Sequence, residues 1–359
     1  MFVTPLIAAP MAGGTTTAEL ALATQGAGAF AFAAGGYKSA EQLAAHIAPL
    51  RATGVDFGVN LFVPRTAPLD AGHVAAVERY RRELRATAAR YGAEIPDELP
   101  GGDDPRAKDF WAEKVALLLA DPIPVVSFTF GLAPAALVDR LHRVGTRVVA
   151  SVTSVPEALA AVESGVDALV VQHANAGGHS AAFLKAPGSG AGSGVGSATG
   201  PGAAAAIQRT LPGLVADVRA AVTLPLIGAG GIAGPEDVKA VLAAGAQAAA
   251  IGTALIRTDE SGARAVHKDA LADPVYKHTA MTRAFTGKPA RALVNDFVRD
   301  HGATAPEAYP EVHFLTAPLR AAAAAANDPR ALNLWAGSGW KAAMDGPAAA
   351  VIDGFLGGL

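Results

Sequence analysis

Eight short apolar segments, each ending at a glycine-rich or polar corner, lie within the first 255 residues of the chain. Such runs predict strands buried on both faces, and their alternation with helical patterns predicts parallel strands joined by helical crossovers. Eight such units are the number that closes a (β/α)8 barrel, which takes about 250 residues, and a doubly wound open sheet is the alternative. The predicted strands are residues 6–9, 29–33, 56–63, 124–129, 147–152, 167–171, 225–229 and 247–251.

Two segments that do not follow this alternation of strands and helices predict additions to the barrel. Residues 64–120 contain two helical patterns separated by a segment rich in Pro, Gly and acidic residues, so we interpret them as an insertion after the third strand that includes the third helix. Residues 1–259 are then predicted to form the barrel, and residues 260–359 a C-terminal helical and loop extension packed on it.

Helix boundaries are predicted from caps and turn residues. Ser39 is a candidate N-cap, and Ser154 with Glu157 has the spacing of a capping box. Further helices are predicted at residues 18–25, 203–221 and 235–244.

The composition excludes several classes of protein. Hydrophobic residues make up 51% of the 359 positions and charged residues 17%, which allows a large core and excludes disorder for most of the chain. The formal net charge of -3 gives no general attraction to nucleic acid or anionic lipid. Because the chain has no cysteine, thiol catalysis, iron–sulfur clusters, thiolate zinc sites and disulfides are excluded. Redox chemistry would therefore require a bound organic cofactor.

The distribution of charged and apolar residues predicts the cellular location of the protein. No Lys or Arg precedes Lys38, so the basic region of a secretory signal is missing, and the apolar runs are too rich in Ala and Gly for a membrane span. The arginines of residues 79–90 are interleaved with Glu83 beside a stripe that includes Val77 and Leu84, which is typical of a solvated helix face. We expect a soluble cytoplasmic protein with no nucleic-acid or membrane partner.

The corner after the sixth strand, Gln172-His-Ala-Asn-Ala-Gly177-Gly178-His179, carries the most chemistry. His179 is the strongest candidate base, because an unperturbed imidazole changes charge near neutral pH and two glycines let other groups approach it. His173 and His179 are not expected to bind a metal, since no nearby carboxylate or thiol completes a site. Gln172 and Asn60 could bond the edge of a planar heterocycle or hold loop backbone in place.

In a parallel barrel the strand-to-helix corners share one face, where active sites of this fold lie. The corners expected to converge there are Met11, Gly35, Asn60, Thr129, Thr153, Gln172, His179, Gly230 and Thr253. Gly230-Gly231 and Gly252-Thr253 expose backbone N–H groups after the seventh and eighth strands, which predicts a phosphate site, with two purely structural turns as the alternative. Gly228 to Ala233 also fits a loose dinucleotide pattern, but no acidic residue follows at the expected distance of about 20 residues.

These residues together resemble the nitronate monooxygenase family, formerly called 2-nitropropane dioxygenases, which are FMN-dependent TIM barrels. The resemblance runs over nearly the whole chain. Its pieces are Ala9-Pro10-Met11-Ala-Gly13, Gly58-Val-Asn60, Ser127-Phe-Thr-Phe-Gly131, the Gln172 to His179 segment, Gly230-Gly231-Ile, Gly252-Thr253, Thr282-Arg283-Ala-Phe-Thr-Gly287-Lys-Pro-Ala-Arg291 and Leu334-Trp335-Ala-Gly337.

The resemblance implies an FMN site and a catalytic residue. His179 matches the family's catalytic histidine. Residues expected at the flavin are Ala9, Pro10, Met11, Asn60, Gln172, Gly177 and Gly178, and those expected to hold its phosphate are Gly230, Gly231, Gly252 and Thr253. The chain departs from the family in having His173 and Asn175 where Gly and Glu are usual, and Thr129 where many relatives carry His. These departures concern the substrate more than the cofactor.

Three functions are compatible with these features. The first is FMN-dependent oxidation of alkyl nitronates, and of nitroalkanes, by O₂ to a carbonyl compound and nitrite. The second is an FMN-dependent NAD(P)H reductase of quinones or enoyl thioesters on the same fold, and the third a non-redox barrel that binds a phosphate ligand. Residues 187–202, where almost every second residue is glycine, are expected to form a mobile loop that tunes access without binding FMN.

Overall fold

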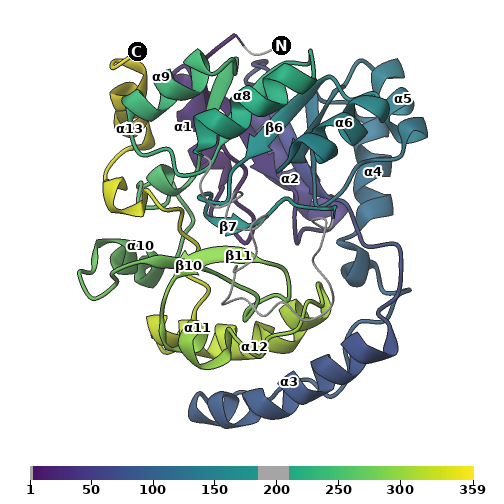
Figure 1. Cartoon of the computed structure of the whole chain (residues 1–359), viewed down its shortest axis with the longest axis vertical. Helices are drawn as coiled ribbons and strands as arrows, with labels where there is room; N and C mark the ends of the chain where they lie inside the picture. The colour runs from purple at the N-terminus through teal and green to yellow at the C-terminus, as the bar shows by residue number, and fades with distance from the viewer. Residues whose placement is uncertain (1–2, 185–209) are drawn as a thin grey trace.

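The computed structural model describes residues 3–184 and 210–359. Its centre is a closed barrel of eight parallel strands in the order β1-β2-β3-β4-β5-β6-β8-β9 (Figure 1), which confirms the predicted (β/α)8 architecture over the open sheet. The barrel strands are β1 (Leu6–Ala8), β2 (Phe30–Ala34), β3 (Gly58–Phe62), β4 (Val125–Thr129), β5 (Arg147–Val152), β6 (Ala168–Gln172), β8 (Leu226–Ala229) and β9 (Ala248–Ile251).

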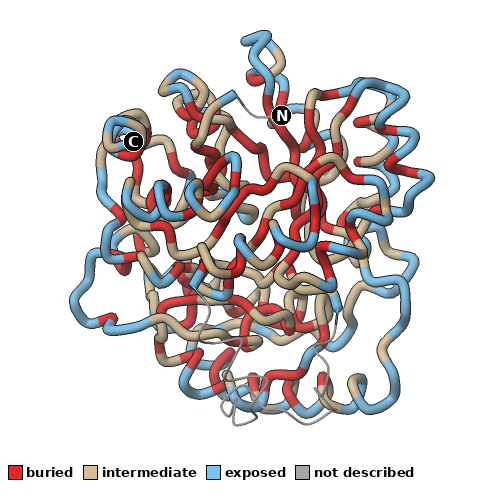
Figure 2. Tube along the Cα trace, turned by 45° about the horizontal axis from the view of Figure 1, so that its top comes forward, coloured by how far each residue is buried: buried red, intermediate tan, exposed pale blue. Residues whose placement is uncertain are grey.

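The strands are apolar because side chains on both faces are buried. Ile7, Phe32, Val125 and Ile227 belong to one packed cluster, and each is at most 3% exposed. The opposite faces pack on the surrounding helices in a larger cluster. Gly58 permits this close packing, since a Cβ there would lie 2.2 Å from the Phe32 ring. Figure 2 shows the buried chain concentrated in the centre and exposed chain at the periphery.

One helix from the end of the insertion and one from the C-terminus complete the outer ring. The ring helices are α1 (Ala18–Gly26), α2 (Ala40–Ala52), α4 (Trp111–Ala120), α5 (Ala135–Arg143), α6 (Val155–Glu163), α8 (Leu211–Ala221), α9 (Pro235–Ala243) and α13 (Ala348–Leu356). The last of these, α13, packs against both α1 and α9, so the end of the chain covers the seam between the first and last strands (Figure 1).

A second layer covers the face where the barrel strands end. It contains a sheet in the order β10-β11-β7 and a helical core in which Tyr80, Phe285, Phe297 and Leu315 are buried. Its elements are α3 (Ala71–Arg90), β7 (Gly178–His179), α10 (Ala265–Ala272), β10 (Thr279–Thr282), β11 (Ala290–Leu293), α11 (Asp296–His301) and α12 (Glu311–Ala325). Within the insertion, α4 packs on α2 in the ring, whereas α3 packs on α12, away from the barrel (Figure 1).

The short helices η1 (Pro105–Lys108), η2 (Thr253–Leu255), η3 (Pro329–Ala331) and η4 (Trp340–Ala342) complete the described elements. The helix predicted at residues 203–221 is observed as α8, from Leu211, and residues 203–209 lie outside the described part. The glycine-rich tract 187–202 also lies outside the described residues. None of the helices that the structure describes is long and apolar enough to cross a membrane.

Two predicted N-caps have different outcomes. Ser39 accepts a hydrogen bond from Gln42 N and caps α2 as predicted. The capping box at Ser154 is wrong in its second half: Glu157 accepts hydrogen bonds from Thr153 and, at 2.7 Å, from Phe183 N. This buried carboxylate therefore holds the chain that follows His179, since it accepts hydrogen bonds from the backbone N–H groups of Phe183 and Leu184.

Candidate active site

A cavity of about 560 Å³ lies at the carboxyl ends of the barrel strands, between the barrel and the second layer. Its volume falls in the usual range for small-molecule sites, about 300–1,000 Å³. Every residue that the sequence assigned to the site lines it, namely Ala9, Pro10, Met11, Asn60, Gln172, Gly177, Gly178, His179, Gly230, Gly231, Gly252 and Thr253. Of the corners expected to converge, Gly35 and Thr153 do not reach its wall.

The turn after β8 presents backbone donors to this cavity. Gly230 and Gly231 have positive φ values of 118° and 78°, a conformation that glycine adopts without strain. The N–H groups of Gly231, Ile232 and Thr253 donate to no described residue. Because backbone donors away from bulk water normally have partners, these groups suit an anionic ligand such as a phosphate.

The second layer also closes over the end of β9 at close range. Thr253 Oγ1 accepts a hydrogen bond of 3.0 Å from Gly337 N. A Cβ on Gly177 would lie 2.6 Å from the same nitrogen, so only glycine permits the approach. The segment that includes Leu334 and Trp335 thereby becomes part of the cavity wall.

Asn60 is buried at the end of β3 and fixed by its amide nitrogen. Nδ2 lies 3.0 Å from Ser127 Oγ and 2.9 Å from Thr129 Oγ1, and Thr129 Oγ1 in turn lies 3.2 Å from Ser151 Oγ. The Oδ1 atom accepts no hydrogen bond from a described residue. Asn60 can therefore accept one from an N–H group of a heterocycle, and its contacts with Ser127 and Thr129 orient it.

The Gln172 side chain forms hydrogen bonds with the backbone of the segment that contains His179. Its Nε2 donates to His179 O at 3.1 Å, and its Oε1 accepts from Ala181 N at 2.7 Å. Both contacts hold β7 against the barrel, which favours the positioning alternative for this residue. One hydrogen on Nε2 remains for a ligand, because the primary amide has two.

His179 is held by elements that lie far from it in the sequence. It sits in β7, a two-residue strand paired with Ala290 of β11. Its Nε2 lies 2.9 Å from Thr286 Oγ1, and its ring lies 5.3 to 5.9 Å, centroid to centroid, from the rings of Trp335, Phe130 and Tyr309. The Nδ1 atom makes no hydrogen bond with a described residue, so it is available to a ligand.

The surroundings keep this imidazole neutral. Burial, together with the positive charges of Lys288 and Arg320, lowers the pKa of His179 to about 3. At neutral pH the ring can accept a proton or a hydrogen bond. It cannot attract an anion by its own charge.

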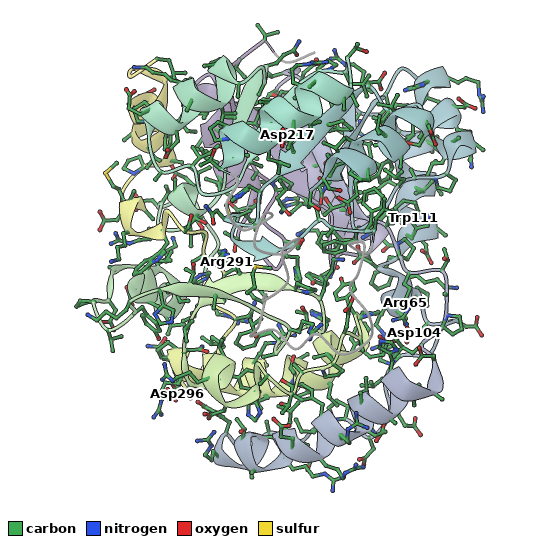
Figure 3. The ribbon with its side chains drawn as sticks, in the orientation of Figure 1. Arg65, Asp104, Trp111, Asp217, Arg291 and Asp296 are labelled. Carbon is green, nitrogen blue, oxygen red and sulfur yellow. The ribbon has the colours of Figure 1, made fainter. Side chains whose placement is uncertain are left out.

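Arg291 links the histidine corner to the second layer. Its Nε donates to Ala174 O at 2.7 Å and its Nη1 to Thr279 Oγ1 at 3.1 Å, and Figure 3 shows it between the barrel and the helices below. The loop between β6 and β7 is thus fixed from β11.

His173 and Asn175, in the same loop, make contacts that support its structure. His173 is 8% exposed and does not line the cavity, and its Nδ1 accepts from Asn175 N at 3.1 Å. Asn175 O accepts from Ser338 N at 3.0 Å. Both residues shape the turn that carries Gly177.

A polar group that the sequence did not predict completes the site. Tyr37, His313 and Arg320 line the cavity, and the Tyr37 and His313 rings stack 4.5 Å apart. Tyr37 follows the glycines after β2, so its corner position was a usable signal. His313 and Arg320 lie in the extension, before the alanine run of residues 321–326, where no motif marks them.

A buried ion pair fixes Tyr37 in this group. Tyr37 N donates to Asp109 Oδ1 at 2.6 Å, and Lys114 Nζ donates to Asp109 Oδ2 at 2.6 Å and to Gly35 O at 2.9 Å. The insertion thus sets the position of a cavity residue. Among the described residues, no three His, Asp or Glu side chains are grouped so as to hold a metal ion.

Comparison with known proteins agrees with this geometry. A family model described as nitronate monooxygenase matches residues 1–356. A probable nitronate monooxygenase of Bacillus subtilis is 32% identical over 339 residues, covering 93% of this chain and 90% of the relative. A solved nitroalkane oxidase from Streptomyces ansochromogenes is 42% identical with a TM-score of 0.88, covering 100% of this chain and 96% of that one.

A more distant structure, FabK from Thermotoga maritima, has 22% identity and a TM-score of 0.71, with 99% of this chain and 93% of that one covered. This likeness concerns the fold alone. The match over nearly the whole chain carries the stronger conclusion: the chain belongs to the nitronate monooxygenase family and is a flavin-dependent oxidoreductase.

Proposed function

We propose that the protein binds FMN and oxidises alkyl nitronates with O₂ to carbonyl compounds and nitrite. Two nitronate anions and one O₂ give two carbonyl compounds and two nitrite anions, so atoms and charge balance, with the nitronate carbon oxidised and O₂ reduced. FMN, when bound, accepts electrons from the nitronate and passes them to O₂. The protein supplies orientation, a polar environment and protection from water.

The cavity has the groups that FMN requires. The free N–H groups of Gly231, Ile232 and Thr253 would hold the phosphate after β8 and β9. Asn60 Oδ1 would accept from the ring system, and the wall of Ala9, Pro10 and Met11 would pack beside it. Any carboxylate near the phosphate would repel it, and the described wall contains no Asp or Glu.

His179 is assigned to proton transfer. Its neutral imidazole is available throughout the neutral range and can take the proton from the carbon beside a nitro group. A base whose conjugate acid has a pKa of about 3 removes such a proton slowly. Nitroalkane oxidation is therefore expected to be slower than oxidation of the nitronate that has already lost the proton.

One observation carries the proposal: His179 lines the same cavity as the phosphate-binding turn, inside a ring of aromatic side chains. The similar Streptomyces protein is described as a nitroalkane oxidase, which agrees with a substrate of this class. The FabK likeness does not favour a reductase, because it rests on the fold.

The proposal is tested by anaerobic mixing of the purified flavoprotein with the nitronate of 2-nitropropane, followed by its visible spectrum. Bleaching by the nitronate and none by NADH or NADPH is the expected result. Rapid bleaching by either nucleotide would replace the proposal with the reductase function. If the protein carries no flavin after incubation with FMN, both flavin-dependent functions are refuted. The non-redox barrel that binds a phosphate ligand is then the remaining function.

A further inference from the structure

Arg320 lines the cavity, and its positive charge has no ion-pair partner among the described residues. Its Nε donates to Thr316 Oγ1 at 3.1 Å and its Nη2 to His313 O at 2.9 Å, both on its own helix α12. Its Nη1 makes no hydrogen bond with a described residue, and no described carboxylate forms an ion pair with the guanidinium. These contacts orient the side chain without neutralising it.

The neighbouring acids are already paired with other cations. Glu311 binds Arg65 at 2.6 Å, and Asp109 binds Lys114 at 2.6 Å. The described wall of the cavity contains Arg264 and Arg320 and no Asp or Glu. The cavity is therefore electropositive, and a buried charge without a partner favours an anionic ligand.

Arg320 belongs to the part of the cavity near His179, the proposed base. It contacts His313, which stacks on Tyr37. The ring of Tyr309, two residues before the start of α12, lies 5.9 Å from the His179 ring. Both side chains, Arg320 and His179, line the same cavity, and the positive charge of Arg320 lowers the pKa of His179. The free N–H groups proposed to hold the FMN phosphate lie elsewhere, after β8 and β9.

We propose that Arg320 binds the substrate anion and gives the cavity its preference for a nitronate over the neutral nitroalkane. The inference rests on the proposed function and adds to it a residue that determines substrate form. The nitronate group is planar and shares its charge between two oxygens, which matches the planar donors of a guanidinium as a carboxylate does. His179 cannot supply this attraction, since it is uncharged at neutral pH.

The test compares Arg320→Met with Arg79→Met, which removes the same charge from an exposed position on α3. For Arg320→Met, kcat/KM for the nitronate should fall about 10- to 100-fold, the usual effect of losing a charged hydrogen bond, while kcat/KM for the neutral nitroalkane changes less than about threefold. Arg320→Lys should keep much of the preference. Arg79→Met should behave as the wild type.

Nitrate, a planar anion that is not oxidised, gives a second readout through the flavin spectrum. It should perturb the wild-type spectrum and bind at least about tenfold more weakly to Arg320→Met. Equal losses on nitronate and nitroalkane, unchanged nitrate binding, or loss of FMN from the variant would overturn the inference. If Arg320→Met does not fold, Arg320→Gln is measured in the same way against the same outcomes.

The two proposals fail separately. A wild-type protein that does not oxidise nitronates refutes the proposed function, and nitrate titration of wild type and Arg320→Met then still decides whether Arg320 is an anion site. Nitronate oxidation that is unaffected by Arg320→Met refutes the role of Arg320 alone.

Discussion

His179 Nε2 lies 2.9 Å from Oγ1 of Thr286, a residue 107 positions later in the chain. The contact joins the corner after a barrel strand to the turn between β10 and β11, so the second layer fixes the ring of the proposed base. Thr286 Oγ1 also lies 3.3 Å from Lys288 O, which restricts its hydroxyl. The active site is therefore shared between the barrel and the C-terminal extension.

Replacing His179 by Asn separates the two substrate forms. Oxidation of a neutral nitroalkane should fall about 10²- to 10⁴-fold, the usual contribution of a general base, while oxidation of the preformed nitronate changes little. Steady-state oxygen uptake with each form, at equal FMN content, measures this. Full activity of the variant on both forms would remove His179 from the mechanism.

The low pKa of His179 predicts a pH dependence of stability. Its pKa is about 3 in the folded protein and near 6.5 in the unfolded chain, so between these values only the unfolded chain binds the proton. This group therefore lowers the free energy of unfolding as the pH falls below 6.5, by up to about 1.4 kcal/mol per pH unit.

Denaturant unfolding at pH 7 and pH 5, at a fixed excess of FMN, checks this for wild type and His179→Asn. The wild type should lose more stability than the variant over this interval. His46 and His267, whose pKa values burial lowers to about 4, are present in both proteins and cancel in the comparison. An equal loss in the two proteins would contradict the buried neutral state of His179.

Most of the fold could be predicted because a buried parallel strand leaves a local signature. All eight barrel strands are predominantly apolar. The site residues were found because strand ends converge in this architecture. The strand β7 was not predicted, since two residues are too few for a pattern. The role of Glu157 was also misjudged, because its partners Phe183 and Leu184 become its neighbours only in the folded chain.

Gly230→Ala should weaken FMN binding. The residue has a φ of 118°, and an added Cβ would lie 2.8 Å from His173 O, so the turn after β8 would have to move. Gly26→Ala is the matched control, as its Cβ would meet no atom within 4 Å. Fluorescence titration with FMN should show weaker binding for Gly230→Ala alone. Unchanged affinity would place the phosphate away from this turn.

Lys114→Met should destabilise the protein strongly. The side chains of Lys114 and Asp109 are 1% and 10% exposed, so the variant leaves a buried carboxylate without its cation, at a cost of about 3–5 kcal/mol in the free energy of unfolding. The exposed pair of Lys239 and Glu236 supplies the control, where Lys239→Met should cost about 1 kcal/mol or less. Similar unfolding midpoints for the two variants would contradict the burial of the first pair.

The part of the site that sequence patterns missed depends on long-range packing. His313 and Arg320 reach the cavity because α12 packs on α3 and closes over the barrel, and nothing local in their segment indicates a ligand. Tyr37 is fixed by Asp109, 72 positions away. Residues of this kind become visible only when the tertiary contacts of the insertion and the extension are known.

The central claim is nitronate oxidation by O₂ at this cavity, and the most direct measurement is oxygen uptake by the purified FMN protein with simultaneous determination of nitrite. With the nitronate of 2-nitropropane, uptake should be rapid and about two nitrite anions should form per O₂ consumed, as the balanced reaction of two nitronates with one O₂ requires. The neutral nitroalkane at the same pH should react more slowly. No nitronate-dependent uptake above that of free FMN would contradict the account.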